Sequence, residues 1–306
     1  MINYLIRRVL LLIPSLVGIT LVSFLILQLV PGDPARTIAG LEADEETVQS
    51  IRRELGLERP ILVQYGIFLE NALTGQFGRS IRTRNEVLTE IWPGFLNTLK
   101  LAVTSISISL LLGVTLGALA ASRHNRPLDY VCTGLALLGV STPTFWSGLL
   151  IILIFSVHLG WFPSGGAQGL ASLVLPAMTL AAPSAAITAR MTRSSLLEVL
   201  RQDYIKAARA KGRTESRVIV GHALKNALIP TVTVVGLQFG YLMGGAVLVE
   251  TIFTWPGLGR LLVNAILTRD YPVVQAGIMF FAAAFLLTNL LVDLLYGWLD
   301  PRITYD

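Results

Sequence analysis

The stretch Asp203-Tyr204-Ile205-Lys206-Ala207-Ala208-Arg209-Ala210-Lys211-Gly212 lies inside a polar connection between two strongly apolar segments. This basic loop, residues 190–229, holds nine Lys and Arg residues against three Asp and Glu residues. No other interior connection flanked by apolar runs is so charged. Such a loop either anchors a protein to a membrane surface or docks onto a cytoplasmic partner, and choosing between these roles decides the function.

The composition predicts an integral membrane protein. Of 306 residues, 53% are hydrophobic and 14% are charged, with a mean hydropathy of +0.66, whereas soluble domains carry about 25% charged residues. A single water-soluble core could not hide so much apolar surface. Cytoplasm-facing Lys and Arg explain the net charge of +5 more simply than nucleic-acid binding does. Cys132, the one cysteine, lies in an apolar run, which favours core packing.

Six apolar runs predict an all-α fold with six transmembrane helices. Pro143 interrupts the third run, and Pro176 and Pro183 interrupt the fourth, which transmembrane helices tolerate where neighbours satisfy the freed carbonyls. The first run is too long for a secretory signal and is stopped by Pro31-Gly32-Asp33-Pro34. The runs cover residues 9–30, 98–121, 130–157, 171–190, 230–250 and 275–297.

Residues 31–97 are polar and rich in acids. Capping signals and helical spacing predict short helices over Glu45–Leu55, Pro60–Leu73 and Asn85–Trp92, the last ended by Pro93-Gly94. The region has too few large apolar residues for a core of its own. We therefore expect residues 31–97 to be an extramembrane, extracytoplasmic helical region within one domain that covers residues 1–306.

The distribution of cations predicts the orientation. Arg7 and Arg8, Arg123 and Arg126, the basic loop, and Arg302 fall on one side of the membrane, and the short opposite connections hold only Arg260 and Arg269. Short loops rich in Lys and Arg stay in the cytoplasm. Both termini and the basic loop are therefore expected to be cytoplasmic, in a multi-pass protein of the inner membrane.

Glycines recur every fourth residue in two runs, at Gly113 and Gly117 and at Gly236, Gly240 and Gly244. Such stripes let helix backbones approach closely. Packing within the subunit is favoured over a subunit interface.

Signs of chemistry are sparse. The histidines, His124, His158 and His222, are scattered, and no cluster has metal-ligand spacing. The chain has no phosphate-binding Gly-x-x-x-x-Gly-Lys-Ser/Thr sequence, so it is not expected to bind ATP itself or to be an enzyme. Glu250 and Asp293 lie near ends of spans, where an end cap, an ion pair and a transport role stay open.

Ser141-Thr142-Pro143-Thr144 places hydroxyls beside a helix-breaking proline. These hydroxyls either satisfy free carbonyls or line a water-filled translocation path, and both interpretations stay open. Gln238, uncharged and inside the fifth run, is a further candidate for the path, or a hydrogen-bonding residue between helices.

Within the basic loop, Leu196, Leu200, Tyr204, Ala207 and Ala208 form an apolar stripe at helical spacing. Gly212 suits a helix C-terminus, and Thr214 followed by Glu215 suits the start of another helix. This predicts two helices joined by a tight turn at Gly212. A lipid anchor needs bulky apolar residues, so the flat Ala207-Ala208 face favours docking onto a protein.

The loop resembles the EAA loop of permease subunits from binding-protein-dependent ABC importers. That pattern is Glu-Ala-Ala, three residues, Gly, nine residues and Ile-x-Leu-Pro. Ala207, Ala208, Gly212 and Leu224 are in register, while Lys206, His222 and Lys225 depart from it.

Flanking segments throughout the chain resemble the dipeptide/oligopeptide/nickel branch. They are Ile13-Pro14, Leu29-Val30-Pro31-Gly32-Asp33-Pro34, Glu54-Leu55-Gly56-Leu57, Arg190-Met191-Thr192-Arg193, Trp255-Pro256-Gly257-Leu258-Gly259-Arg260 and Arg269-Asp270-Tyr271-Pro272.

The resemblance implies a type I importer permease fold that works by alternating access. It implies three kinds of partner: a homologous second permease, two ATPase subunits that bind the ATP and Mg²⁺, and an extracytoplasmic solute-binding protein. Peptides are the first choice of solute, with glutathione or nickel chelates as alternatives and a stand-alone secondary transporter as the competing class. The helix Tyr204–Lys211 would couple the permease to an ATPase through Tyr204, Lys206, Ala207, Ala208, Arg209, Lys211 and Gly212.

Overall fold

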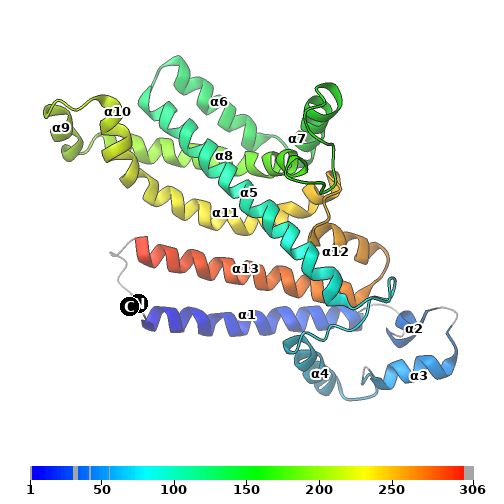
Figure 1. Ribbon diagram of the computed structural model, residues 1–306. Coiled ribbons are helices and arrows are strands. Elements are labelled where there is room, and N and C mark those ends of the chain that lie inside the picture. Colours follow the sequence, from blue (N-terminus) through cyan, green and yellow to red (C-terminus); the bar gives the residue numbers. More distant parts are fainter. Residues whose placement is uncertain (1, 30–33, 41–42, 55, 300–306) are drawn as a thin grey trace. The chain divides into compact units, whose positions relative to one another are not determined.

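The computed structural model describes residues 2–29, 34–40, 43–54 and 56–299. These residues form helices and their connections, with an isolated β-bridge between Arg79 and Glu86 (Figure 1). The predicted all-α class is confirmed. The chain divides into two compact units: Thr98–Pro256 with the segment from Thr288 onward, and Ile2–Asn97 with Gly257–Leu287. Whether the whole chain behaves as a single domain stays a prediction.

Among the described residues, four helical stretches are long and apolar enough to cross a membrane. They are α5 (Val87–Ser122), α8 (Ala171–Leu200), the run Glu215–Ile252 that ends in α11 (Leu224–Ile252), and Tyr271–Val292 of α13 (Tyr271–Leu299). A bent pair, Pro127–Ser141 and Thr144–His158, makes a fifth if its halves form one span. Helix α1 (Ile2–Leu29) is apolar over Leu10–Ile26.

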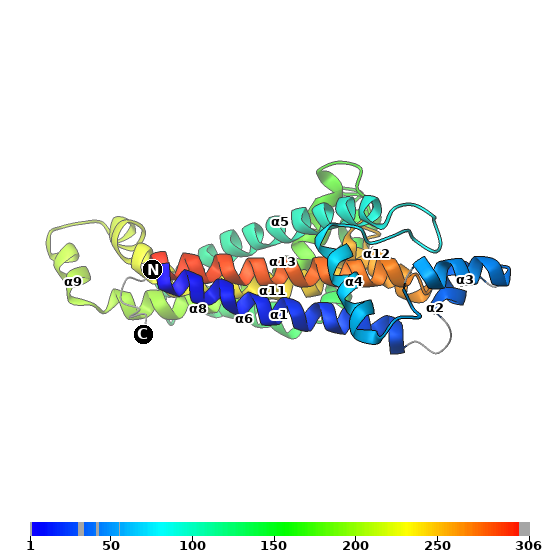
Figure 2. The ribbon, with the colours of Figure 1, turned by 90° about the horizontal axis from the view of Figure 1, so that it is seen from below.

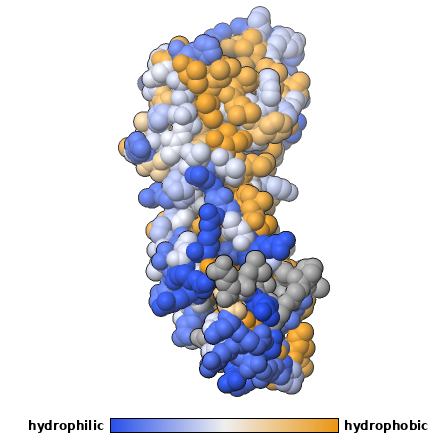
Figure 3. Space-filling view, turned by 90° about the vertical axis from the view of Figure 1, so that its right-hand side faces the viewer, coloured by the Kyte–Doolittle hydropathy of each residue, from blue (hydrophilic) through white to orange (hydrophobic). Residues whose placement is uncertain are grey.

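The bent pair lies in the run predicted as one span over residues 130–157, and its bend falls at the interruption predicted for Pro143. Helix α6 (Pro127–Ser141) ends before Pro143, and α7 (Thr144–Ile151) with the π-helical segment η1 (Ile152–His158) leaves it at 109°. Pro143 has no N–H to continue the helix, and it takes the N-cap position of α7. Large apolar side chains on α7 and η1 face outward, including Trp146, Leu149 and Val157. Figure 3 shows apolar surface in the upper part of the view.

The unit built from Ile2–Asn97 and Gly257–Leu287 contains the predicted short helices. Helix α3 (Glu45–Glu54) and α4 (Ile61–Leu73) confirm two of them, and α2 (Pro34–Ala39) was not predicted. Residues 30–33, in the predicted stop of the first span, lie outside the described residues. Helix α4 packs on α1, where the Phe24 ring contacts those of Tyr65 and Phe68.

The third short helix was predicted over Asn85–Trp92, and these bounds are wrong. Helix α5 begins at Val87 and passes through Pro93 without ending, because loss of one backbone hydrogen bond does not stop a helix that is held by packing. Val87 and Ile91 are fully buried against Leu258 and Leu262 of α12 (Leu258–Leu267). An added Cβ at Gly94 would lie 3.3 Å from the Leu258 nitrogen, so glycine permits this close approach.

Asp270 fastens the loop before α5 to the connection between α12 and α13. Its buried carboxylate accepts a hydrogen bond from Ser80 Oγ at 2.5 Å and one from the Ile81 backbone N–H at 3.1 Å. Arg82 donates a longer backbone bond at 3.4 Å. Charge-assisted bonds of this kind are roughly twice as strong as neutral ones. The Arg269–Pro272 motif therefore has a structural role in this unit.

Helix α8 is the centre of the other unit and the most buried candidate span. An added Cβ at Gly113 of α5 would lie 2.8 Å from the Ala185 carbonyl oxygen, and one at Gly117 would lie 2.4 Å from that of Ala189. At Gly236 of α11, the nearest atom would be Val292 Cγ1 at 2.8 Å, whereas Gly244 faces open space. Packing within the subunit is confirmed for Gly113, Gly117 and Gly236.

We expect Gly117→Ala to destabilise the protein by about 1–3 kcal/mol, because the new methyl group meets the α8 backbone rather than a movable side chain. Gly134→Ala on α6 is the matched control, since nothing lies within 4 Å of its added Cβ. The measurement is the thermal unfolding midpoint of the purified protein in detergent. Equal midpoints for the two variants would contradict the close α5–α8 packing.

Candidate functional site

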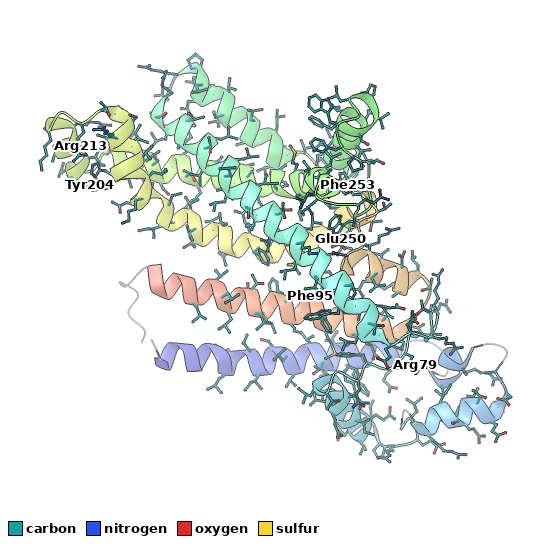
Figure 4. The ribbon with its side chains drawn as sticks, in the orientation of Figure 1. Arg79, Phe95, Tyr204, Arg213, Glu250 and Phe253 are labelled. Carbon is teal, nitrogen blue, oxygen red and sulfur yellow. The ribbon has the colours of Figure 1, made fainter. Side chains whose placement is uncertain are left out.

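The predicted basic loop forms a small helical projection at one end of the unit centred on α8. Helix α8 continues past the predicted loop start to Leu200, and α9 (Asp203–Ala210) and α10 (Glu215–Val218) follow. The π-helical segment η2 (Ile219–Ala223) then leads into α11. Figures 1 and 2 both place α9 beyond the end of α8. Tyr204 and Arg213 mark this projection in Figure 4.

The predicted turn at Gly212 is confirmed. Gly212 has a φ of +73°, in the left-handed region that glycine adopts without strain. Its backbone N–H donates to the Arg209 carbonyl at 2.9 Å and that of Lys211 donates to the Ala207 carbonyl at 3.1 Å. Thr214 takes the N-cap position of α10 as predicted, but its side chain makes no capping hydrogen bond.

Ile205, which the predicted apolar stripe omitted, anchors α9. It is fully buried in a cluster with Leu196 of α8, Val218 of α10 and Ala227 of α11. The connection at Arg201 and Gln202 ends α8 before α9 begins, so helical spacing counted from Leu196 does not carry across it. Tyr204 and Ala207 are consequently exposed, and the predicted stripe is wrong there. Ala208 packs partly against the cluster.

Polar residues of α9 make ion pairs and a hydrogen bond, some of them to neighbouring helices. The Arg209 guanidinium donates to both Glu215 oxygens, at 3.1 Å from Nε and 2.6 Å from Nη2, and so ties α9 to α10. These hydrogen bonds raise the pKa of Arg209, against a smaller opposing effect of burial. Lys206 Nζ donates to Asp203 Oδ1 at 2.8 Å. The Tyr204 hydroxyl accepts from Asn226 Nδ2 at 2.7 Å, which ties α9 to α11.

The outward face of α9 is therefore narrow and defined by small residues. Ala207 and Ala210 are exposed, flanked by Lys206 and Lys211. The structure brings together all seven residues predicted for coupling, on α9 and its C-terminal turn. It also separates their roles, because Tyr204 and Arg209 hold the helix while Ala207 faces outward. This arrangement leaves a small-residue face exposed on a helix that Ile205 anchors.

A buried ion pair near the start of α6 connects that helix to α8. Asp129 is 2% exposed, and Arg193 donates to Oδ1 from Nε at 2.7 Å and to Oδ2 from Nη2 at 2.8 Å. The Asn125 backbone N–H donates to Oδ2 at 3.0 Å, and His124 Nδ1 lies 3.2 Å from the same oxygen. Sequence analysis missed Asp129, although a lone acid at the edge of an apolar run was the available signal.

The residues predicted for a translocation path lie on separate elements. Ser141 to Thr144 form the break between α6 and α7, where Thr142 Oγ1 donates to the Leu138 carbonyl at 2.7 Å. That bond agrees with the interpretation in which the Thr142 hydroxyl donates to a carbonyl left free at the helix break. Gln238 lies in the middle of α11 and is 6% exposed. Which residues line a path stays a prediction.

Of the two acids near span ends, the structure describes the side chain of Glu250 alone. Glu250 is fully buried, and Thr98 Oγ1 donates to its Oε1 at 2.5 Å, linking α11 to α5 (Figure 4 labels Glu250). The side chain of Asp293 lies outside the described residues. Within the described ranges, no group of three or more His, Cys, Asp or Glu residues could hold a metal ion.

This geometry defines a class: a helical membrane protein that carries a short, exposed helix on one polar loop. Comparison with known proteins gives the family. Residues 113–305 match the binding-protein-dependent transport system inner membrane component, and residues 1–102 match the N-terminal component of the same systems. The chain belongs to this family of binding-protein-dependent transport permeases.

Curated relatives match over the full length of both chains. The chain is 46% identical to the glutathione transport system permease protein GsiC of Escherichia coli K12 and 47% identical to that of Salmonella typhi. It is 44% identical to the dipeptide transport system permease protein DppB of Alkalihalophilus pseudofirmus. The chain is thus an ABC transporter permease subunit of the inner membrane, a kind of subunit that has no catalytic activity itself.

Two solved structures support the fold at 20% identity. An inward-facing MetNI methionine ABC transporter aligns with a TM-score of 0.57 over 70% of this chain and 97% of that one. An amino acid ABC transporter with histidines aligns with a TM-score of 0.52 over 67% and 92%. The architecture is therefore that of ABC importer permeases.

We expect Arg193→Gln to destabilise the protein by about 3 kcal/mol, because it leaves the buried Asp129 carboxylate without its cation. The variant Asp129→Asn/Arg193→Gln should recover most of the loss, since neither side chain then carries an unpaired charge. Arg190→Gln, one turn earlier on α8 and exposed, is the matched control and should change stability by less than about 0.5 kcal/mol. Chemical unfolding in detergent measures all three, and an Arg193→Gln shift no larger than the control would refute the role of the pair.

Proposed function

We propose that this chain is one of two homologous permease subunits in an importer that moves short peptides into the cytoplasm by alternating access. Two ATPase subunits supply ATP and Mg²⁺ binding, and an extracytoplasmic binding protein delivers the peptide. The observation that carries the proposal is α9: a short helix held by Ile205 and by the Arg209–Glu215 pair, with Ala207 facing outward.

The rigidity of α9 supports coupling to an ATPase. A docking helix transmits motion only if its own attachment is stiffer than the element that it moves. Ile205 packs against residues of α8, α10 and α11, and the Tyr204–Asn226 bond adds a second link to α11. A push on α9 therefore reaches both α8 and α11. Lys206 and Lys211 flank the docking face and suit acidic groups on the ATPase.

Short peptides are the solute class supported by the relatives. The curated proteins named above carry glutathione, itself a tripeptide, or dipeptides, and they match this chain over its full length. A peptide backbone is the feature that these solutes share. Nickel chelates lack that feature and are the less favoured alternative.

We infer six membrane crossings. The four long candidate spans, the bent α6–η1 pair and α1 make up this number. The cation-rich α5–α6 connection and the α9 loop then face the cytoplasm together with both termini, in agreement with the positive-inside rule. The loop between η1 and α8 faces the opposite side.

The proposed function is tested with the full complex in proteoliposomes. Wild type should take up labelled dipeptide or glutathione only with ATP and the binding protein present. Ala207→Trp should lower peptide-stimulated ATP hydrolysis at least about tenfold, equal to about 1.4 kcal/mol of lost docking energy. Gly212→Pro should do the same, because proline cannot adopt a positive φ.

The control is Ala171→Trp, an exposed alanine at the start of α8 and far along the chain from α9. It should leave stimulation unchanged. Normal stimulation in Ala207→Trp would remove the docking role of α9. Uptake by the permease without ATPase subunits would instead favour a stand-alone transporter.

The orientation is tested by cysteine labelling in a Cys132→Ala background, in cells that lack the ATPase subunits. Gln168→Cys, in the connection before α8, should react with a membrane-impermeant maleimide in intact spheroplasts. Arg213→Cys, in the α9 loop, should react only after permeabilisation. Both positions are exposed, so the reverse labelling pattern would show that the orientation is wrong.

A further inference from the structure

An open-sided cavity of about 140 Å³ lies between α5, α6 and α8, next to the α5–α6 connection. Its walls are almost wholly apolar, and none of its described lining residues is acidic. The size is close to that of cavities of about 150 Å³ that stay dry and take up small apolar molecules. Helix α6 contributes the largest share of the lining, including Cys132, Ala136, Leu137 and Val140.

The cavity opens on an apolar surface of α6. Leu137 and Val140 line the cavity and are 65% and 46% exposed. Leu135 is exposed on the same helix, and so is Tyr130 in its first turn. Tyrosine at a helix end suits the boundary between lipid tails and headgroups. A cavity that opens on such a surface is filled from the bilayer rather than from water.

Three arginines without an acidic partner lie near one end of this cavity. Arg190 of α8 lines the cavity and is exposed. Arg123 and Arg126 are exposed in the α5–α6 connection. In that connection, His124 Nδ1 lies 3.2 Å from Nη2 of Arg193, which also lines the cavity. Among the described residues, Arg123, Arg126 and Arg190 make no ion pair, so this end of the cavity has excess positive charge.

The positive end of the cavity lies toward the basic loop. Figures 1 and 2 place the α5–α6 connection at the end of α8 from which the chain continues into α9. The proposed orientation puts this end at the cytoplasmic headgroup layer. An apolar cavity between helices is thus joined to positive charge at the membrane surface, and basic pockets of this kind bind anionic lipid headgroups.

We propose that the cavity binds an anionic phospholipid of the membrane, with part of one acyl chain between α5, α6 and α8 and the phosphate at Arg190. Arg123 and Arg126 attract the same headgroup. A water-soluble anion has no use for the apolar walls, and a zwitterionic lipid gains less from three unpaired cations. A neighbouring protein helix needs small residues for close approach, whereas the rim of this cavity carries Leu137 and Val140. The site does not depend on which solute the permease carries.

The test uses the full-length chain in nanodiscs, together with the subunits that copurify with it. The probe is phosphatidylglycerol that carries a photoreactive diazirine in one acyl chain, diluted into phosphatidylcholine. In wild type, mass spectrometry should find saturable labelling within residues 132–140 and 186–190. Phosphatidylcholine with the same diazirine should label these segments without saturation.

Arg190→Gln should raise the phosphatidylglycerol fraction needed for half-maximal labelling about fivefold, the contribution of one arginine near an anionic headgroup. Arg201→Gln is the matched control. Arg201 is exposed at the C-cap of the same helix and does not line the cavity. The control should leave the half-maximal fraction unchanged.

A second pair of variants tests the acyl chain. Leu137→Trp adds bulk at the rim of the cavity and should abolish saturable labelling. Leu135→Trp is its control, since Leu135 is 52% exposed on the same helix and does not line the cavity. Cys132, which is 5% exposed, gives an independent readout. Its alkylation by N-ethylmaleimide should slow as the phosphatidylglycerol fraction rises in wild type, but not in Arg190→Gln.

Equal saturable labelling by the two lipids would overturn the inference, and so would an unchanged half-maximal fraction in Arg190→Gln. Saturable labelling that survives Leu137→Trp would place the acyl chain elsewhere and overturn it too. Competition by glycerol phosphate, which has the phosphate without acyl chains, would reduce the site to a phosphate site. Labelling that the isolated chain shows and the assembled complex loses would mean that a protein covers the cavity. Either of these last two results would also overturn the inference.

Discussion

The close packing of small residues along α8 is the constraint on which the unit around it depends. Gly113 and Gly117 bring α5 against the α8 backbone, and the Asp129–Arg193 pair connects the start of α6 to the same helix. Lipid offers no hydrophobic driving force between helices, so close van der Waals contact must hold them together. A larger side chain at any of these contacts would separate the helices. These contact positions therefore tolerate few substitutions.

The same helix connects this packing to the docking loop. Helix α8 continues beyond the predicted membrane boundary to Leu200, and Leu196 joins the cluster that buries Ile205 of α9. Helix α9 also contacts α11 through the hydrogen bond that Asn226 donates to the Tyr204 hydroxyl. Helix α9 is therefore attached to both α8 and α11.

Predictions from local sequence were wrong where tertiary contacts stabilised a helix that contains a helix-breaking residue. Pro93 was expected to end a helix, but the burial of Val87 and Ile91 against α12 holds that helix together on the N-terminal side of the proline. Pro143 did end one, and there residues 140–146 are exposed or half-buried and the chain turns by 109°. The apolar stripe of the loop failed for another reason. A short break at Arg201 and Gln202 shifted the helical phase, and periodicity cannot be counted across such a break.

The sequence by itself determined the all-α class, most membrane-spanning segments, two of the three small helices before α5, the turn at Gly212 and the family. These features depend on composition, on local backbone preference and on motif order, all of which can be read from the sequence. Only the tertiary structure decided that Ile205 anchors α9, that Asp129 pairs with Arg193 and that Gln238 has no hydrogen-bonding partner among the described residues. Each of these depends on which residues from distant segments meet. A helix with hydrophobic residues on every side has no periodicity that shows which of its residues contact other helices.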